Sequence, residues 1–131
     1  MDEITFLTID DVLEIHSRQL ALYGGLEGFI DRNVVESATA QPQASMFGQY
    51  LHEDLAEMAA AYLFHFAAAQ GFADGNKRTA AACATVFLGR NGYELGCTDD
   101  ELYELTMAVA NGRMTKEEAG DWIRDRLIAA L

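Results

Sequence analysis

The chain has 131 residues, enough for one domain of ordinary size, and half of them are apolar, so it can bury a core without disulfide or zinc staples. Nine Lys and Arg residues stand against 21 Asp and Glu, which gives a formal net charge of −12. This balance argues against broad binding to nucleic acid or to an anionic membrane, although it is compatible with a small local anion site. The two cysteines, Cys83 and Cys97, lack the paired spacing of a zinc site or a disulfide framework.

We expect no secretory signal in the N-terminal segment and no membrane span in the longest apolar run. The first residues, MDEITFLTID, are acidic and lack the basic region and apolar stretch of a secretory signal. The longest apolar run, Met58 to Ala69, is interrupted by His65 and is too short to span a bilayer. We therefore expect a protein of the reducing cytoplasm, with no nucleic acid and no membrane among its partners.

Helical periodicity starts near the N-terminus. A first helix is expected between its N-cap, Thr8, and the pair Gly24-Gly25. Asp31 is the expected cap of a second, short helix. That helix must end near residue 41, because Pro42 disfavours helical geometry in the residue before it. Residues 41–48 are then left as a connecting segment.

Two apolar helices are expected in the middle of the chain. The first, from about residue 53 to 69, is apolar on most of its circumference, which is typical of a central helix. The second, from about residue 76 to 90, is alanine-rich and closes at Asn91-Gly92, a pair suited to a C-terminal cap.

Two capping boxes mark the last helices: Thr98 with Glu101, and Thr115 with Glu118. The sequence therefore predicts an all-α fold, a single compact domain over residues 1–131. It would contain about six helices, with a short flap between the second and third and little room for a sheet.

One segment, Gly71 to Thr79 (GFADGNKRT), joins the two most apolar helices and carries polar and charged side chains. Burying such side chains between apolar helices costs stability, which indicates a functional reason for them. A helix starting there would offer unpaired backbone N–H groups and a positive dipole end to a phosphate. Gly75 would let the ligand approach the backbone, and Lys77 and Arg78 would add positive charge. Asp74 would bind Mg²⁺ carried in with a nucleotide. From spacing alone, the alternative is an ordinary Asp-Gly-Asn turn before a solvated first helical turn.

The residues Phe72 to Thr79 resemble the signature H-x-F-x-[DE]-G-N-[GK]-R of the Fic superfamily, and D-G-N-K-R-T is similar to its death-on-curing (Doc) branch. The resemblance covers roughly the whole chain. Leu13 to Gly28 is similar to the first helix and glycine turn of that branch, and Phe87 to Tyr93 to a helix ending. Ala40 to Phe47 is similar to its target-docking flap, which here would comprise Gln43, Ala44, Ser45, Met46 and Phe47.

This resemblance implies an α-helical fold and transfer of a phosphate-containing group from a nucleotide to a protein hydroxyl. Most Fic members transfer AMP, whereas the Doc toxin phosphorylates translation elongation factor Tu and is neutralised by an antitoxin protein. AMP-transferring members usually carry a second arginine where this chain has Ala81, and this difference, with Lys77, favours phosphate transfer. The implied cofactors are Mg²⁺ with ATP or another nucleoside triphosphate. The implied nucleotide-binding residues are Phe72, Gly75, Asn76, Lys77 and Arg78.

The catalytic histidine of the family lies two residues before the motif phenylalanine, and that position here is Gln70. A glutamine amide can hold a hydroxyl but cannot take its proton, and losing a general base costs on the order of a hundred- to ten-thousand-fold in rate. Because phosphoryl transfer depends mostly on positioning and electrostatics, residual activity is compatible with Gln70. Gln70 is either natural or an engineered substitution.

None of the three histidines is expected to replace the missing base. His65 should be buried and bonded to backbone, His16 should pack on the apolar face of its helix, and His52 should lie on the surface. Four functions stay open: a Doc-like phosphotransferase impaired at Gln70, an AMP-transferring Fic enzyme, a non-catalytic module that binds nucleotide or antitoxin, and a helical domain whose motif is a relic.

Overall fold

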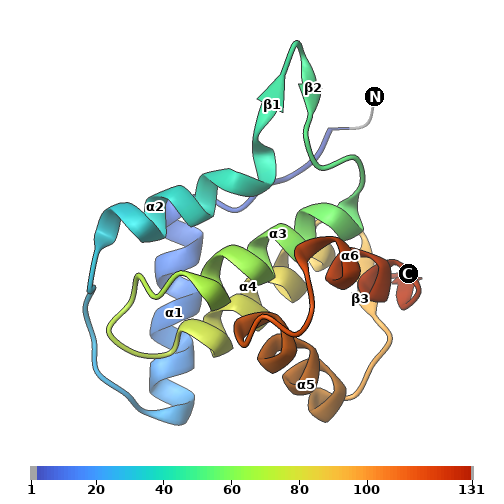
Figure 1. Cartoon of the computed structure of the whole chain (residues 1–131). Helices are drawn as coiled ribbons and strands as arrows, with labels where there is room; N and C mark the ends of the chain where they lie inside the picture. The colour runs from blue at the N-terminus through green and yellow to red at the C-terminus, as the bar shows by residue number, and fades with distance from the viewer. Residues whose placement is uncertain (1–2, 131) are drawn as a thin grey trace.

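The structure, a computed structural model, describes residues 3–130 and has six α-helices in that range (Figure 1). They are α1 (Ile9–Tyr23), α2 (Arg32–Ala40), α3 (Leu55–Ala68), α4 (Asn76–Arg90), α5 (Asp99–Ala110) and α6 (Lys116–Arg124). A 3-10 turn, η1 (Gln41–Gln43), and four short strands, β1 (Ser45–Met46), β2 (Gln49–Tyr50), β3 (Tyr93–Leu95) and β4 (Leu127–Ala129), complete it. The predicted helical architecture is confirmed. The predicted domain also includes Met1, Asp2 and Leu131, which lie outside the described residues.

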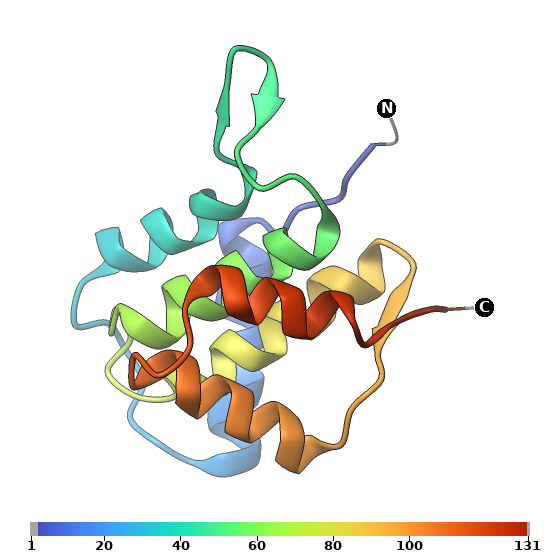
Figure 2. The ribbon, with the colours of Figure 1, turned by 45° about the vertical axis from the view of Figure 1, so that its right-hand side comes forward.

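Helix α3 is the centre of the fold. Helices α4, α5 and α6 pack against it, and α1 packs against α4 (Figures 1 and 2). Ala59, Ala60 and Ala61 are fully buried, and such small side chains let neighbouring helices approach closely. Tyr62 is buried as well, and its hydroxyl accepts a hydrogen bond from the backbone N–H of Leu7 at 2.9 Å. Within residues 3–130, no helix is both long enough and apolar enough to cross a membrane.

Side-chain caps set most of the helix starts. Thr8, Thr98 and Thr115 form complete capping boxes at α1, α5 and α6, and Asp31 and Asp54 cap α2 and α3. These caps satisfy backbone N–H groups that a helix leaves unpaired, which explains why the predicted starts of α1, α5 and α6 are confirmed. Of the six described helices, α4 alone begins without a side-chain cap.

The connecting segment after α2 contains a small hairpin that the sequence did not reveal. Strands β1 and β2 pair antiparallel, with Ser45 opposite Tyr50 and Met46 opposite Gln49. The turn residues Phe47 and Gly48 both have positive φ (52° and 77°), as a two-residue type I′ turn requires. The hairpin projects away from the helices (Figures 1 and 2), and the Phe47 side chain is 96% exposed.

Candidate functional site

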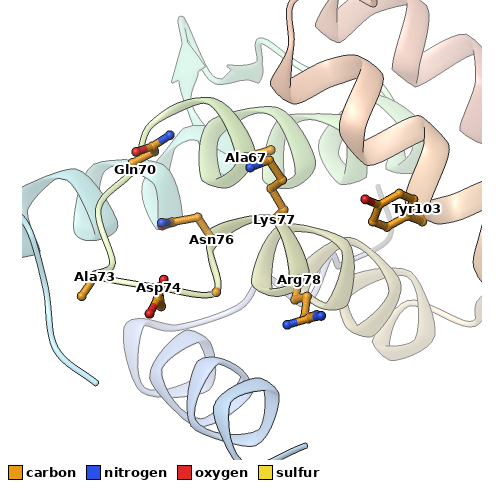
Figure 3. Close-up of a pocket in the computed structure, with 9 residues that line it drawn as sticks. Ala67, Gln70, Ala73, Asp74, Asn76, Lys77, Arg78 and Tyr103 are labelled. Atoms are coloured by element: carbon orange, nitrogen blue, oxygen red, sulfur yellow. The ribbon is translucent and has the colours of Figure 1, made fainter. Parts of the chain in front are cut away.

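The junction between α3 and α4 lines an open hollow of about 350 Å³ (Figure 3). Its lining residues are Ala67, Gln70, Ala73, Asp74, Gly75, Asn76, Lys77, Arg78 and Tyr103. The structure thus brings together Gln70, Asp74 and the predicted nucleotide-binding residues other than Phe72. Tyr103 comes from α5 and was not selected, because nothing in the sequence links it to a motif 25 residues earlier.

The start of α4 is open to this hollow. Gly75 adopts the left-handed conformation (φ 79°, ψ 16°), and the first helical hydrogen bond runs from the Thr79 N–H to the Gly75 carbonyl at 2.9 Å. The N–H groups of residues 76–78 precede that bond, so the helix gives them no acceptor. With no side-chain cap in the described chain, they retain the partial positive charge of a helix N-terminus.

Asp74 is fixed by the glycine turn after α1. Its Oδ2 accepts a hydrogen bond from the backbone N–H of Leu26 at 2.8 Å, whereas no partner of Oδ1 is found within residues 3–130. No cluster of three or more His, Cys, Asp or Glu in the described chain could hold a metal by itself. A single half-buried carboxylate suits Mg²⁺ that arrives with phosphate oxygens as further ligands, since Mg²⁺ often binds through one carboxylate and a nucleotide.

Asn76 and Phe72 are joined by two hydrogen bonds within the loop that precedes α4. The Asn76 Oδ1 accepts from the Phe72 N–H, and the Asn76 Nδ2 donates to the Phe72 carbonyl, both at 3.0 Å. Phe72 is 1% exposed, its ring stacks on Phe29 with ring centroids 5.6 Å apart, and it lines a different hollow, beside α1. Phe72 is therefore the predicted nucleotide-binding residue that the structure does not bring to the lining.

Lys77 and Arg78 are exposed, and neither forms an ion pair with another residue of the described part of the chain. Their side chains point in opposite directions from the first turn of α4 (Figure 3). The guanidinium carbon of Arg78 lies 4.3 Å from the centre of the Tyr23 ring, within the range of a cation–π contact. Both cations also line a second hollow, of about 520 Å³, between α1, α4 and α5.

His16 on α1 contacts Phe72 and Asp74, in the loop before α4. Its ring is 6% exposed and stacks on Phe72 with centroids 3.7 Å apart and planes 8° from parallel. Its Nε2 lies 2.8 Å from the backbone oxygen of Asp74. The expected packing role is confirmed, but the hydrogen bond to the motif loop was missed, because a periodic pattern cannot show which distant loop a buried polar atom meets.

Gln70, the position at which the family resemblance led us to expect a base, is exposed. Gln70 follows α3 at one end of the hollow, and Tyr103 lies at the other end (Figure 3). His65 lines a different hollow, with Asn33, Val34, Ser37, Ala38 and Ala69, and burial lowers its pKa to about 4. His65 is half-buried rather than fully buried, and the expected bond to backbone is not found: its Nε2 has no partner within residues 3–130. The prediction that His52 lies on the surface is wrong: the residue is 9% exposed, and its side chain lies near η1 and α6.

The predicted flap residues lie away from the hollow. Gln43 ends η1, Ala44 follows it, and Ser45, Met46 and Phe47 belong to the hairpin. Met46 and Phe47 are exposed apolar side chains and do not pack in the core.

Comparison with known proteins gives the following matches. The sequence model of the Fic/DOC family matches residues 6–88. The protein named protein kinase doc, of Escherichia phage P1, is 33% identical over 115 residues, which are 88% of this chain and 90% of that protein. The protein named toxin Doc, of Mycolicibacterium smegmatis (strain ATCC 700084 / mc(2)155), is 37% identical over 95 residues, 72% of this chain and 71% of that protein.

Proposed function

Because this chain belongs to the Fic/Doc family, we propose that it is a Doc-like toxin of a toxin–antitoxin module. It binds a nucleoside triphosphate with Mg²⁺ at the start of α4 and is built to transfer phosphate to a hydroxyl of a target protein. The match to a relative named as a kinase supports phosphate transfer over AMP transfer. The lack of a second arginine at Ala81 supports it further.

The observation that carries this proposal is the uncapped start of α4. Its first N–H groups face no protein acceptor within the helix, and they lie beside Lys77 and Arg78 in one open hollow. Phosphate oxygens would satisfy these groups and neutralise both cations. Glycine at position 75 adopts the left-handed conformation without strain, and this conformation sets the direction of the N–H groups at the start of α4.

Asp74 would hold the Mg²⁺ through its Oδ1, and the ion would neutralise charge on the phosphates. The Leu26 N–H keeps the carboxylate in place by binding Oδ2. Asp74 is the acidic residue among those that line the hollow, so it offsets only part of the positive charge there.

Gln70 limits the chemistry of the chain as written. Its amide can hold the attacking hydroxyl but has no basic atom to take the proton, so we expect transfer to be slower by about a hundred- to ten-thousand-fold than with histidine. The chain would keep its nucleotide site because Gln70 follows α3, whereas the amide cradle belongs to α4.

An antitoxin protein is the proposed partner, and translation elongation factor Tu is the proposed target. The exposed hairpin with Phe47 and Met46 would contact the target. All of these interactions would take place in the cytoplasm.

Gln70 also favours a second candidate function, a non-catalytic module that binds nucleotide or antitoxin without transferring a group. Measurable phosphorylation of a target by the chain as written would exclude this module. AMP transfer remains separable by mass, because AMP adds much more to the target than phosphate does.

The decisive experiment restores the histidine. Gln70→His expressed alone should arrest growth, co-expression of the cognate antitoxin should relieve the arrest, and the unmodified chain should arrest growth weakly or not at all. Arg78→Ala in the Gln70→His background is the matched control, because it removes a phosphate-binding charge at an exposed position without disturbing the core. Normal growth with soluble Gln70→His protein, together with no binding of Mg²⁺–ATP in calorimetry, would overturn the proposed function.

A further inference from the structure

His16 of α1 contacts both the Phe72 ring and the Asp74 backbone in the loop before α4. It stacks on Phe72, its Nε2 lies 2.8 Å from the Asp74 carbonyl oxygen, and a Cβ on Gly75 would lie 3.6 Å from its ring. We propose that His16 is a positioning residue that locks the Asp74–Gly75 peptide in the orientation needed for phosphate binding. This inference rests on the proposed function of the α4 start.

The geometry of the peptide bond gives the reason. A carbonyl oxygen can only accept, so the His16 Nε2 must be the donor, and it draws the Asp74 carbonyl toward α1. In a planar trans peptide the N–H points opposite to the C=O. The Gly75 N–H is therefore turned away from α1 and toward the hollow, where it adds a donor ahead of those of residues 76–78.

The neighbouring groups of the loop are held by other bonds. The Ala73 N–H donates to the Gly28 carbonyl at 3.0 Å, Oδ2 of Asp74 is bound by Leu26, and the Gly75 carbonyl accepts from Thr79. The carbonyl of Asp74 is left to His16. Because Gly75 adopts left-handed and right-handed conformations almost equally well, this peptide could rotate if the donor were removed. A rotated peptide would present a carbonyl oxygen to the phosphate in place of an N–H.

The His16 ring is held in one orientation by its packing. It is buried against Phe72, with planes 8° from parallel, so the stacking fixes the plane in which Nε2 points. Two substitutions separate the stacking from the hydrogen bond. His16→Phe keeps an aromatic ring on Phe72 but loses the donor. His16→Gln loses the ring but keeps an amide donor at nearly the position of Nε2.

The test measures Mg²⁺–ATP binding by calorimetry and thermal unfolding for the whole chain and for both variants. We expect His16→Phe to bind on the order of 10- to 100-fold more weakly, the equivalent of one hydrogen bond to a charged group, with a melting temperature a few degrees below that of the parent. His16→Gln should retain most of the affinity even if it melts at lower temperature. Equal affinity of His16→Phe and the parent would overturn the inference, as would a loss of affinity in both variants that follows their loss of stability.

A measurement on the unmodified chain tests the His16 hydrogen bond itself, even if a variant fails to fold. In ¹⁵N spectra without nucleotide, the Nε2 of His16 should carry the proton, and an Nδ1–H form with a bare Nε2 would overturn the inference. If no chain binds Mg²⁺–ATP while Nε2 is protonated, the proposed function fails, and only the hydrogen bond from His16 to the Asp74 carbonyl stands.

Discussion

Replacing Gly75 by alanine would test whether the phosphate cradle depends on a left-handed residue at the start of α4. Gly75 has φ +79°, a region that costs an L-residue about 1–2 kcal/mol. The added Cβ would lie 3.4 Å from Leu20 Cδ2 and 3.6 Å from the His16 ring, which are ordinary contacts. The cost is therefore conformational rather than steric, and we expect Gly75→Ala to lower the free energy of unfolding by about 1–2 kcal/mol.

The same strain would weaken binding at this position. Alanine relieves its strain by moving φ toward negative values, which swings the Gly75 N–H away from the hollow. A hydrogen bond to a charged group contributes about 1.5–3 kcal/mol, so the affinity for Mg²⁺–ATP should fall about 10- to 100-fold.

Gly112 offers a matched control after α5. Its φ is +74°, and a Cβ added there would have no neighbouring atom within 4 Å, so Gly112→Ala should lose similar stability in urea titrations and keep the parent's affinity in calorimetry. Equal nucleotide affinity in the two variants, at equal cost in stability, would refute the assignment of the cradle to Gly75.

Two further predictions concern the ion pair between α1 and α4 and the hairpin. Arg90 donates two hydrogen bonds to Asp11 and holds the pKa of Asp11 at about 2, below its ordinary 3.8. A lowered folded-state pKa stabilises the fold above about pH 4, and this contribution is lost as the pH falls toward 2. Because the side chains of Arg90 and Asp11 are 39% and 22% exposed, solvent screening reduces the effect, and Asp11→Asn should cost about 1 kcal/mol at pH 7 in urea titrations. The cost should shrink as the pH falls below about 4 and vanish only below about pH 2, and a constant cost at every pH would contradict the ion-pair explanation. Phe47→Ser should change the free energy of unfolding by less than about 0.5 kcal/mol, because the ring is 96% exposed, yet it should reduce growth arrest by Gln70→His; full arrest would exclude target contact by the ring.

Local signals in the sequence were sufficient for the helices and for the place of the motif. Thr8, Thr98 and Thr115 cap helices through residues only three positions away, so the chain itself contains both partners of each capping box. The largely apolar circumference of residues 53–69 likewise predicted a central helix, because a helix that is apolar on most of its surface must be buried on most of it.

Contacts between distant segments were decided only by the tertiary structure. The sequence selected Phe72 and Asn76 as nucleotide-binding residues, but it could not show that the Asn76 side chain hydrogen-bonds the Phe72 backbone, nor that the Leu26 N–H donates to the Asp74 carboxylate. His16 was assigned to packing, and its hydrogen bond joins residues 58 positions apart in the chain. The hairpin around Phe47 is too short for an alternating pattern to be recognised. Periodicity and caps report what a residue does within its own helix, whereas the direction of a buried donor depends on which helix folds against it, and that is set by the packing of the whole core.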